Sequence, residues 1–124
     1  MAVDEIPADV RAFISRFIRS VGHLELLLFI FDARERTWSV DDLVREMRTN
    51  ASLVEQQLKD LSGPIRKVDS QGFQFDIKSP ETMEIVRRVS EHYRTRRHAM
   101  ISEVYAQPLA TIQSFADAFK IKKD

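Results

Sequence analysis

Apolar residues recur in the first quarter of the chain at helical spacing. Between residues 6 and 22 they form one stripe: Val10, Phe13, Ile14, Phe17, Ile18 and Val21. This spacing predicts an amphipathic helix, with Pro7 in its first turn and a break near Gly22. Leu24–Phe31 is apolar on nearly every side, which is typical of a central helix contacted on several faces.

Two short helices are predicted between residues 40 and 61. Ser39 can cap the first helix, and Asp41 and Asp42 fall in its first turn, where the helix dipole favours anions. Asn50 or Ser52 can cap the second helix. The positions expected to be buried are Leu43, Val44, Met47, Leu53, Val54, Leu58 and Leu61.

Extended segments flank this helix pair. "TWSV" (37–40) precedes it as a short strand-like piece. After it, "IRKVDSQGFQFDIK" alternates, and Phe73, Phe75 and Ile77 share one face. Ser70–Gly72 carries a hairpin signal, so residues 65–78 are predicted to form a two-stranded antiparallel hairpin.

The C-terminal third is predicted to be helical. Ser79 and Pro80 open a helix of more than twenty residues that Pro108 ends. A last short helix is expected from about Thr111 to Phe119. Its apolar residues Phe115 and Phe119, with Ile121, indicate a docking segment, because disordered tails usually lack paired aromatics.

One stripe of the long helix is close to a heptad seam interrupted by Arg96. Its members are Val86, Val89, Tyr93, Met100 and Val104. We expect this stripe to pair with a second copy of the chain, since so long a helix exceeds what a small domain can cover. The alternative is that the stripe packs on the first helix of its own chain.

In chain order the elements are helix, helix, short strand, helix, turn, helix and hairpin. This order resembles the winged helix-turn-helix superfamily, over Leu24–Ile77, without matching one named family within it. It is similar to the bacterial transcriptional-regulator type with an added C-terminal dimerisation helix. The resemblance implies a mostly α fold with a small β-hairpin. It also implies a winged helix-turn-helix domain at residues 1–80, and a helical extension for dimerisation and docking at residues 81–124.

In winged-helix regulators the second helix of the pair enters the DNA major groove, and the hairpin contacts the neighbouring backbone or minor groove. The resemblance therefore implies that Ser52, Glu55, Gln56 and Lys59 face the groove, with Asn50 at its entry. Gln56 can bind adenine through a bidentate pair, Lys59 can reach guanine or a phosphate, and Glu55 can accept from cytosine. Phosphate contacts are expected from Arg45, Arg48, Arg66 and Lys67.

A second function stays open, because the helix pair carries five acids and three bases between residues 38 and 63. Glu55 and Asp60 would face or flank phosphates, and the hairpin tip has no Arg or Lys. A winged-helix module that holds a protein partner on Ala51–Leu61 is the alternative. Arg94–His98 is either a phosphate patch or a solvated helix face.

Composition narrows the function classes further. The 124 residues have a net charge of +0, so no global field draws the chain to nucleic acid or to membranes. No cysteine is present, which excludes disulfides and thiolate chemistry and fits the cytoplasm. The N-terminus has no apolar signal region, and the longest apolar run, Leu26–Phe31, is too short to span a bilayer.

Candidate chemistry is sparse. His92 and His98 lie six residues apart, which does not fit the i, i+4 spacing of a helical metal pair, and His23 is distant. No glycine-rich phosphate loop or nucleophile motif occurs in the three-glycine sequence. We therefore expect no enzyme activity, no metal and no cofactor. The expected function is DNA binding in transcriptional regulation, as a cytoplasmic homodimer on double-stranded DNA.

Overall fold

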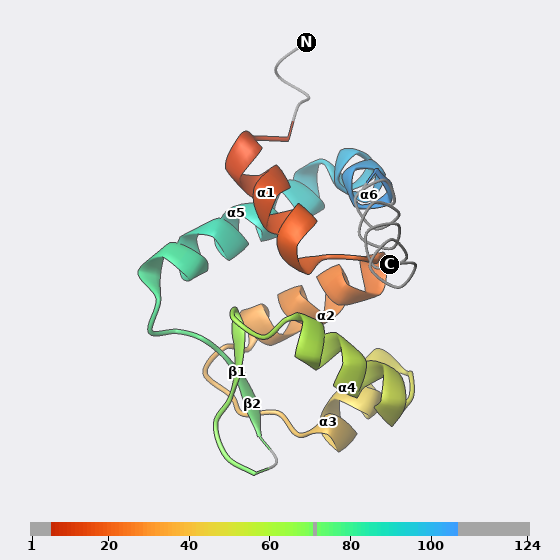
Figure 1. Cartoon of the computed structure of the whole chain (residues 1–124), viewed down its shortest axis with the longest axis vertical. Coiled ribbons are helices and arrows are strands. Elements are labelled where there is room, and N and C mark those ends of the chain that lie inside the picture. The colour runs from red at the N-terminus through yellow and green to blue at the C-terminus, as the bar shows by residue number, and fades with distance from the viewer. Residues whose placement is uncertain (1–5, 71, 107–124) are drawn as a thin grey trace, which may run out of the picture.

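The computed structural model describes residues 6–70 and 72–106 of the chain. In these residues six helices and one two-stranded antiparallel sheet follow each other (Figure 1). Their order is α1 (Ala8–Phe17), α2 (Val21–Asp32), α3 (Val40–Met47), α4 (Ala51–Asp60), β1 (Ile65–Lys67), β2 (Phe73–Phe75), α5 (Pro80–Thr95) and α6 (Arg97–Tyr105). The prediction of a mostly α fold with a small β-hairpin is confirmed.

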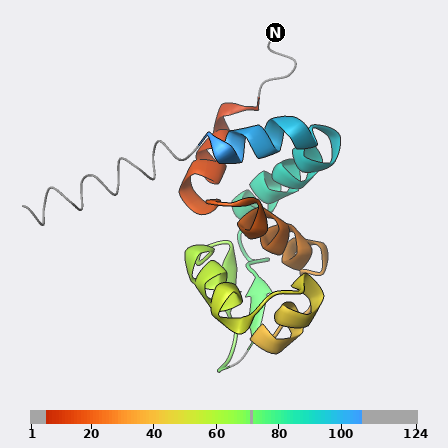
Figure 2. The same ribbon diagram turned by 90° about the vertical axis from the view of Figure 1, so that its right-hand side faces the viewer.

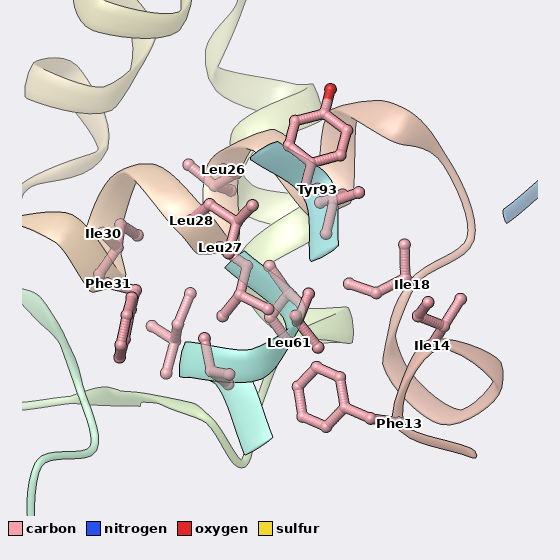
Figure 3. Packing of buried hydrophobic residues seen from close by; sticks show 14 of the residues in the cluster. Phe13, Ile14, Ile18, Leu26, Leu27, Leu28, Ile30, Phe31, Leu61 and Tyr93 are labelled. Atoms are coloured by element: carbon pink, nitrogen blue, oxygen red, sulfur yellow. The ribbon is translucent and has the colours of Figure 1, made fainter. Parts of the chain in front are cut away.

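Helix α2 lies between two groups of elements (Figures 1 and 2). We call α1, α5 and α6 the helical half, and α3, α4, β1 and β2 the hairpin half. Leu24, Leu27 and Ile30 of α2 are completely buried, as expected of a helix that is apolar on nearly every side. Side chains of α1, α2 and α5 meet in one interior (Figure 3).

The first helix ends earlier than its apolar stripe suggests. Helix α1 stops at Phe17, and Ile18 is extended but fully buried. The break lies at Ile18–Ser20 and not at Gly22, because the Ser20 hydroxyl caps α2 by accepting from the His23 backbone N–H. Gly22 lies inside α2, where a Cβ would be 2.9 Å from the Gln57 side-chain nitrogen. Its lack of a side chain lets α4 approach closely.

The helix pair begins as predicted. Ser39 and Asp42 form a capping box, in which each side chain accepts from the backbone N–H of the other. The Asn50 side chain caps α4 by accepting from the Leu53 N–H. Leu53 itself was wrongly predicted to be buried, since it is 45% exposed on the outer side of α4.

The hairpin pairs Ile65 with Phe75. "TWSV" contributes only an isolated bridge, in which Trp38 and Phe73 exchange backbone hydrogen bonds of 2.8 and 2.7 Å. The Trp38 side chain is buried, with its ring centroid 4.8 Å from that of Phe29. Ile77, expected on the face of Phe73 and Phe75, is exposed beyond the end of β2.

The predicted single long helix is wrong. Arg96, with φ −134° and ψ 50°, separates α5 from α6. Helix α6 turns at this point and packs against both α1 and α5 (Figure 2). Ser79 caps α5 as expected, by accepting from the Thr82 N–H. Because the chain turns at Arg96, both α5 and α6 can pack on the apolar side of α1. A single straight helix of the same length would extend past α1, and most of that helix would stay uncovered.

The predicted dimer seam therefore lies inside one chain. Its five residues, all buried in the common core, are Val86, Val89, Tyr93, Met100 and Val104. They pack with the buried side chains of α1, which is the alternative that the sequence left open. These side chains are thus not available to a second copy of the chain in this structure.

The expected helix at about Thr111–Phe119 and the docking residues Phe115, Phe119 and Ile121 lie outside the described residues. The division of the chain at residue 80 stays a prediction. Within residues 6–70 and 72–106, no helix is both long enough and apolar enough to cross a membrane.

Candidate nucleic-acid interface

A groove of about 780 Å³ runs between the outer side of α4 and strand β1. Its lining contains Ser52, Glu55, Gln56, Leu58, Lys59, Ser62, Gly63, Ile65, Arg66, Lys67 and Phe73. Six of the nine residues predicted to contact DNA are in this set, although α4 and β1 are separate elements. The structure thus brings together the predicted base-contacting and phosphate-contacting side chains on one surface.

Cations outnumber acids in this groove. Lys59, Arg66 and Lys67 line it with one carboxylate, that of Glu55. Within the described part of the chain, no carboxylate lies within ion-pair distance of any of the three cations. The Arg66 Nε is buried and has no hydrogen-bond partner there. The exposed Lys59 and Lys67 are therefore available to an anion from outside the chain, whereas the Arg66 Nε is not.

A second hollow, of about 390 Å³, lies beside the groove. It shares Glu55, Lys67 and Phe73 with the groove and extends to Ser39 and Asp41 at the start of α3. Asp41 makes this end acidic, since Lys67 is its only cation among the lining residues. Of these two hollows, only the groove where α4 faces β1 has more cations than acids in its lining.

Asp42 is engaged within the chain. It accepts from the Ser39 N–H at 3.3 Å and from Arg45 at 2.7 Å, and lies 3.8 Å from Arg36. The hydrogen bond from the Ser39 backbone, aided by Arg45, lowers the pKa of Asp42. Asp42 therefore stabilises the start of α3, and its charge is shared with two arginines.

Asp60 is also engaged within the chain. Its carboxylate lies 2.9 Å from His23 Nε2 and accepts from the Gln56 side-chain nitrogen at 3.2 Å. Desolvation raises the pKa of Asp60, but the hydrogen bonds from His23 and Gln56 outweigh it, and the net pKa is lowered. Two of the five acids of the helix pair, Asp42 and Asp60, thus have partners within the chain, whereas Glu55 lies in the groove.

His23, which the sequence set apart from the other histidines only by its distance, is a buried link between α2 and α4. Its Nδ1 lies 2.8 Å from Ser20 Oγ, and its Nε2 faces Asp60. Because an ionised carboxylate only accepts, Nε2 must donate to Asp60, and Nδ1 then accepts from the serine in the neutral ring. Ser20 in turn caps α2, so this Ser-His-Asp chain orders a helix start. No local motif marks it, since 37 residues separate His23 from Asp60.

Three predicted contact residues lie outside the groove lining. Arg45 binds Asp42, and the Asn50 side chain caps α4. Arg48 ends α3 in the left-handed conformation, with φ 55° and ψ 55°, and is exposed. Only Arg48 of these three has its side chain uncommitted at the turn between the two helices.

Comparison with protein-family models, curated proteins and solved structures gave no match to this chain.

The basic segment Arg94–His98 lies at the turn between α5 and α6, on the helical half. Arg97 there lies 3.8 Å from Glu25, and its guanidinium is 4.6 Å from the Tyr93 ring centroid. Across residues 6–70 and 72–106, no three His, Asp or Glu side chains gather as a metal site would require.

Proposed function

We propose that this chain is a winged-helix DNA-binding protein that presents α4 to the major groove and β1 to the adjacent phosphates. The observation that carries the proposal is the groove in which Gln56 and Lys59 of α4 face Arg66 and Lys67 of β1. Lysine and arginine supply affinity by displacing counterions from phosphates, while an amide side chain can discriminate between bases.

The charge of the helix pair is compatible with this proposal. Asp42 and Asp60 are held by partners inside the chain, and the three groove cations are not. Glu55 is then the one acid on the proposed contact surface. It fits a major-groove position opposite the amino group of cytosine, which is a hydrogen-bond donor.

The test is titration of the protein with random and genomic duplex DNA at several salt concentrations. Replacing Arg66 and Lys67 by Ala should weaken binding on all sequences and lower the salt slope by about one unit for each lost phosphate contact. The control removes the same charge from the other half, through Arg94→Ala and Arg97→Ala, and should keep the slope. Binding no tighter than about 0.1 mM at low salt contradicts the proposal.

We further propose transcriptional regulation as a homodimer, in which symmetry places two α4 helices in successive major grooves. Because the seam residues Val86, Val89 and Tyr93 are buried in one chain, such a dimer must use another surface. Light scattering at micromolar concentration is the measurement. A mass of one chain, with DNA binding retained, limits the proposal to a monomeric DNA-binding protein.

A second candidate function is a docking module for a protein partner. The exposed Leu53 on α4 favours it, because an apolar side chain beside Ser52 gains nothing from contact with phosphates. Leu53→Ser separates the two candidates: it should leave the salt slope of DNA binding unchanged and abolish capture of a partner on this face. The basic groove makes DNA the better-supported ligand.

A further inference from the structure

The amide of Gln56 has a defined orientation on the groove. Its Nε2 donates to Asp60 Oδ1 across one helical turn, at 3.2 Å. A carboxylate oxygen accepts and does not donate, so the nitrogen end of the amide must be the end that faces Asp60. The amide oxygen is then on the other side of the group.

Asp60 is itself held in place. His23 Nε2 lies 2.9 Å from its second oxygen, and the His23 ring is fixed by Ser20 at 2.8 Å. His23 is 8% exposed, whereas Gln56 lies on the surface. A chain of hydrogen bonds thus runs from the buried start of α2 to a solvent-facing side chain in the groove. Because each link is charge-assisted or buried, the carboxylate has little freedom to rotate.

We propose that Asp60 is a specificity-determining positioning residue, which, held by His23, orients the Gln56 amide for adenine. A bidentate contact to adenine needs the amide oxygen to accept from N6 and one amide hydrogen to reach N7. The amide nitrogen has two hydrogens, so it can donate to Asp60 and to N7 together. Without Asp60, the amide can turn about its last bond and offer the reversed pattern to other bases.

This inference rests on the proposed DNA binding, and its predicted effect is on base preference. A duplex is first selected from a random pool, and each base pair is then varied. Gln56→Ala should reduce the preference at one adenine by roughly 5- to 150-fold, the worth of a bidentate pair. Asp60→Asn, which keeps the shape of the side chain, should lower the preference at the same position by several-fold. In the double variant it should add nothing to Gln56→Ala.

The matched control is Glu46→Gln, which removes the same charge from an exposed site on α3. It should change affinity for all sequences alike and leave every base preference as it was. A purely structural role of Asp60 predicts the same uniform change. Unchanged discrimination in Asp60→Asn, with DNA still bound, overturns the inference alone. Increased adenine preference also overturns it, because it means that the Asp60 bond holds the amide away from the base.

A second measurement needs no DNA. In the free protein, nuclear magnetic resonance of the Gln56 side-chain NH2 group should report an ordered amide, and Asp60→Asn should make it as mobile as other surface glutamines. An amide that is already mobile in the parent protein overturns the inference. Failure to bind any duplex removes the proposed function and the specificity role with it. If the protein binds no duplex but the Gln56 amide is ordered, the hydrogen-bonded chain from Ser20 to Gln56 exists but has no role in DNA recognition.

Discussion

The surface charges of the helical half are arranged differently from those of the groove in the hairpin half. In the helical half, Arg88 binds Asp9 and Arg87 binds Glu84, and these arginines lower the pKa values of both acids. In the groove of the hairpin half, Lys59, Arg66 and Lys67 have no such carboxylate among the described residues. Ion pairs thus offset charges on the helical half and around Asp42 on α3, whereas the groove between α4 and β1 keeps a positive strip.

Surface ion pairs of the first kind contribute little to stability. Among the described residues, Lys59, Arg66 and Lys67 form no ion pair that would stabilise the fold, and like charges on neighbouring elements repel one another. Their presence in the groove supports the proposal that it binds an external anion. The contrast places the candidate binding surface on the hairpin half, and the variants below test each side of it in turn.

The largest expected effect comes from a charge inside the helical half. Val89→Glu buries a carboxylate in a site with 0% exposure, which should cost several kcal/mol and abolish cooperative thermal unfolding. The matched control is Val68→Glu in the hairpin half, where valine is 37% exposed, and its transition should stay close to the parent. Circular dichroism during heating measures both. The opposite result would be a parent protein that is a stable dimer and a Val89→Glu variant that is a folded monomer. That result would support the original prediction that Val89 lies in a dimer interface.

Trp38 joins the hairpin half to α2, and its removal should be the next most costly change. The ring is 4% exposed and contacts Phe29, so Trp38→Ala should destabilise the fold by about 3–5 kcal/mol. Trp38→Phe should cost less than Trp38→Ala, because it keeps an aromatic ring in the site and the buried indole N–H has no partner to lose among the described residues. Urea unfolding measures both variants. Native tryptophan emission at the wavelength of the free amino acid contradicts the burial.

Removing a helix cap should destabilise the fold by less than Trp38→Ala does, and the loss should differ between the two halves. Ser39→Ala removes a reciprocal capping box, while Ser79→Ala removes a single backbone contact and a bond to the Thr82 hydroxyl. Each loss should cost about 0.5–2 kcal/mol, with Ser39 at the upper end. Chemical unfolding of the two variants compares them directly. A costlier Ser79→Ala means that the capping box adds nothing beyond an ordinary cap.

The smallest expected effect is a change in the pH dependence of stability. The folded pKa of Asp60 lies below its ordinary value, so its contribution is present at neutral pH and is lost as the pH falls through the folded pKa. The stability difference between the parent and Asp60→Asn should therefore shrink as the pH falls below about 4. Unfolding midpoints across this range measure it. A difference that is constant with pH shows that the charge of Asp60 is not what stabilises the contact.

Local patterns were enough to predict most elements. The caps at Ser39, Asn50 and Ser79 follow from side chains that accept from free backbone N–H groups. The break at Arg96 was not predictable, because neither proline nor glycine marks it. The break lets α6 fold back and bury Met100 against the rest of the core. This burial depends on α1, which lies some eighty residues earlier in the chain, so local propensity does not reveal it.

The candidate site also has features that could be expected from the sequence and features that could not. The residues of α4 and β1 that the resemblance implied as DNA contacts line one groove, namely Ser52, Glu55, Gln56, Lys59, Arg66 and Lys67. The engagement of Asp60 by His23 joins residues that no spacing rule connects. The net charge of a segment is also a poor guide to the charge that its surface offers. Asp42 counts fully in the sequence, but on the surface Arg45 and Arg36 offset its charge.

The return of α6 to α1 has a consequence for synthesis of the chain. Helix α1 leaves the ribosome first, but Arg97–Tyr105 completes the cover of its apolar side. At about 5–20 residues per second, the nascent helix waits on the order of several seconds with that side open. During this interval its apolar side is exposed surface of the kind that promotes aggregation and that chaperones cover. Translation that stops after β2 releases a product in which α1 stays uncovered, and such a product is a natural target for proteolysis.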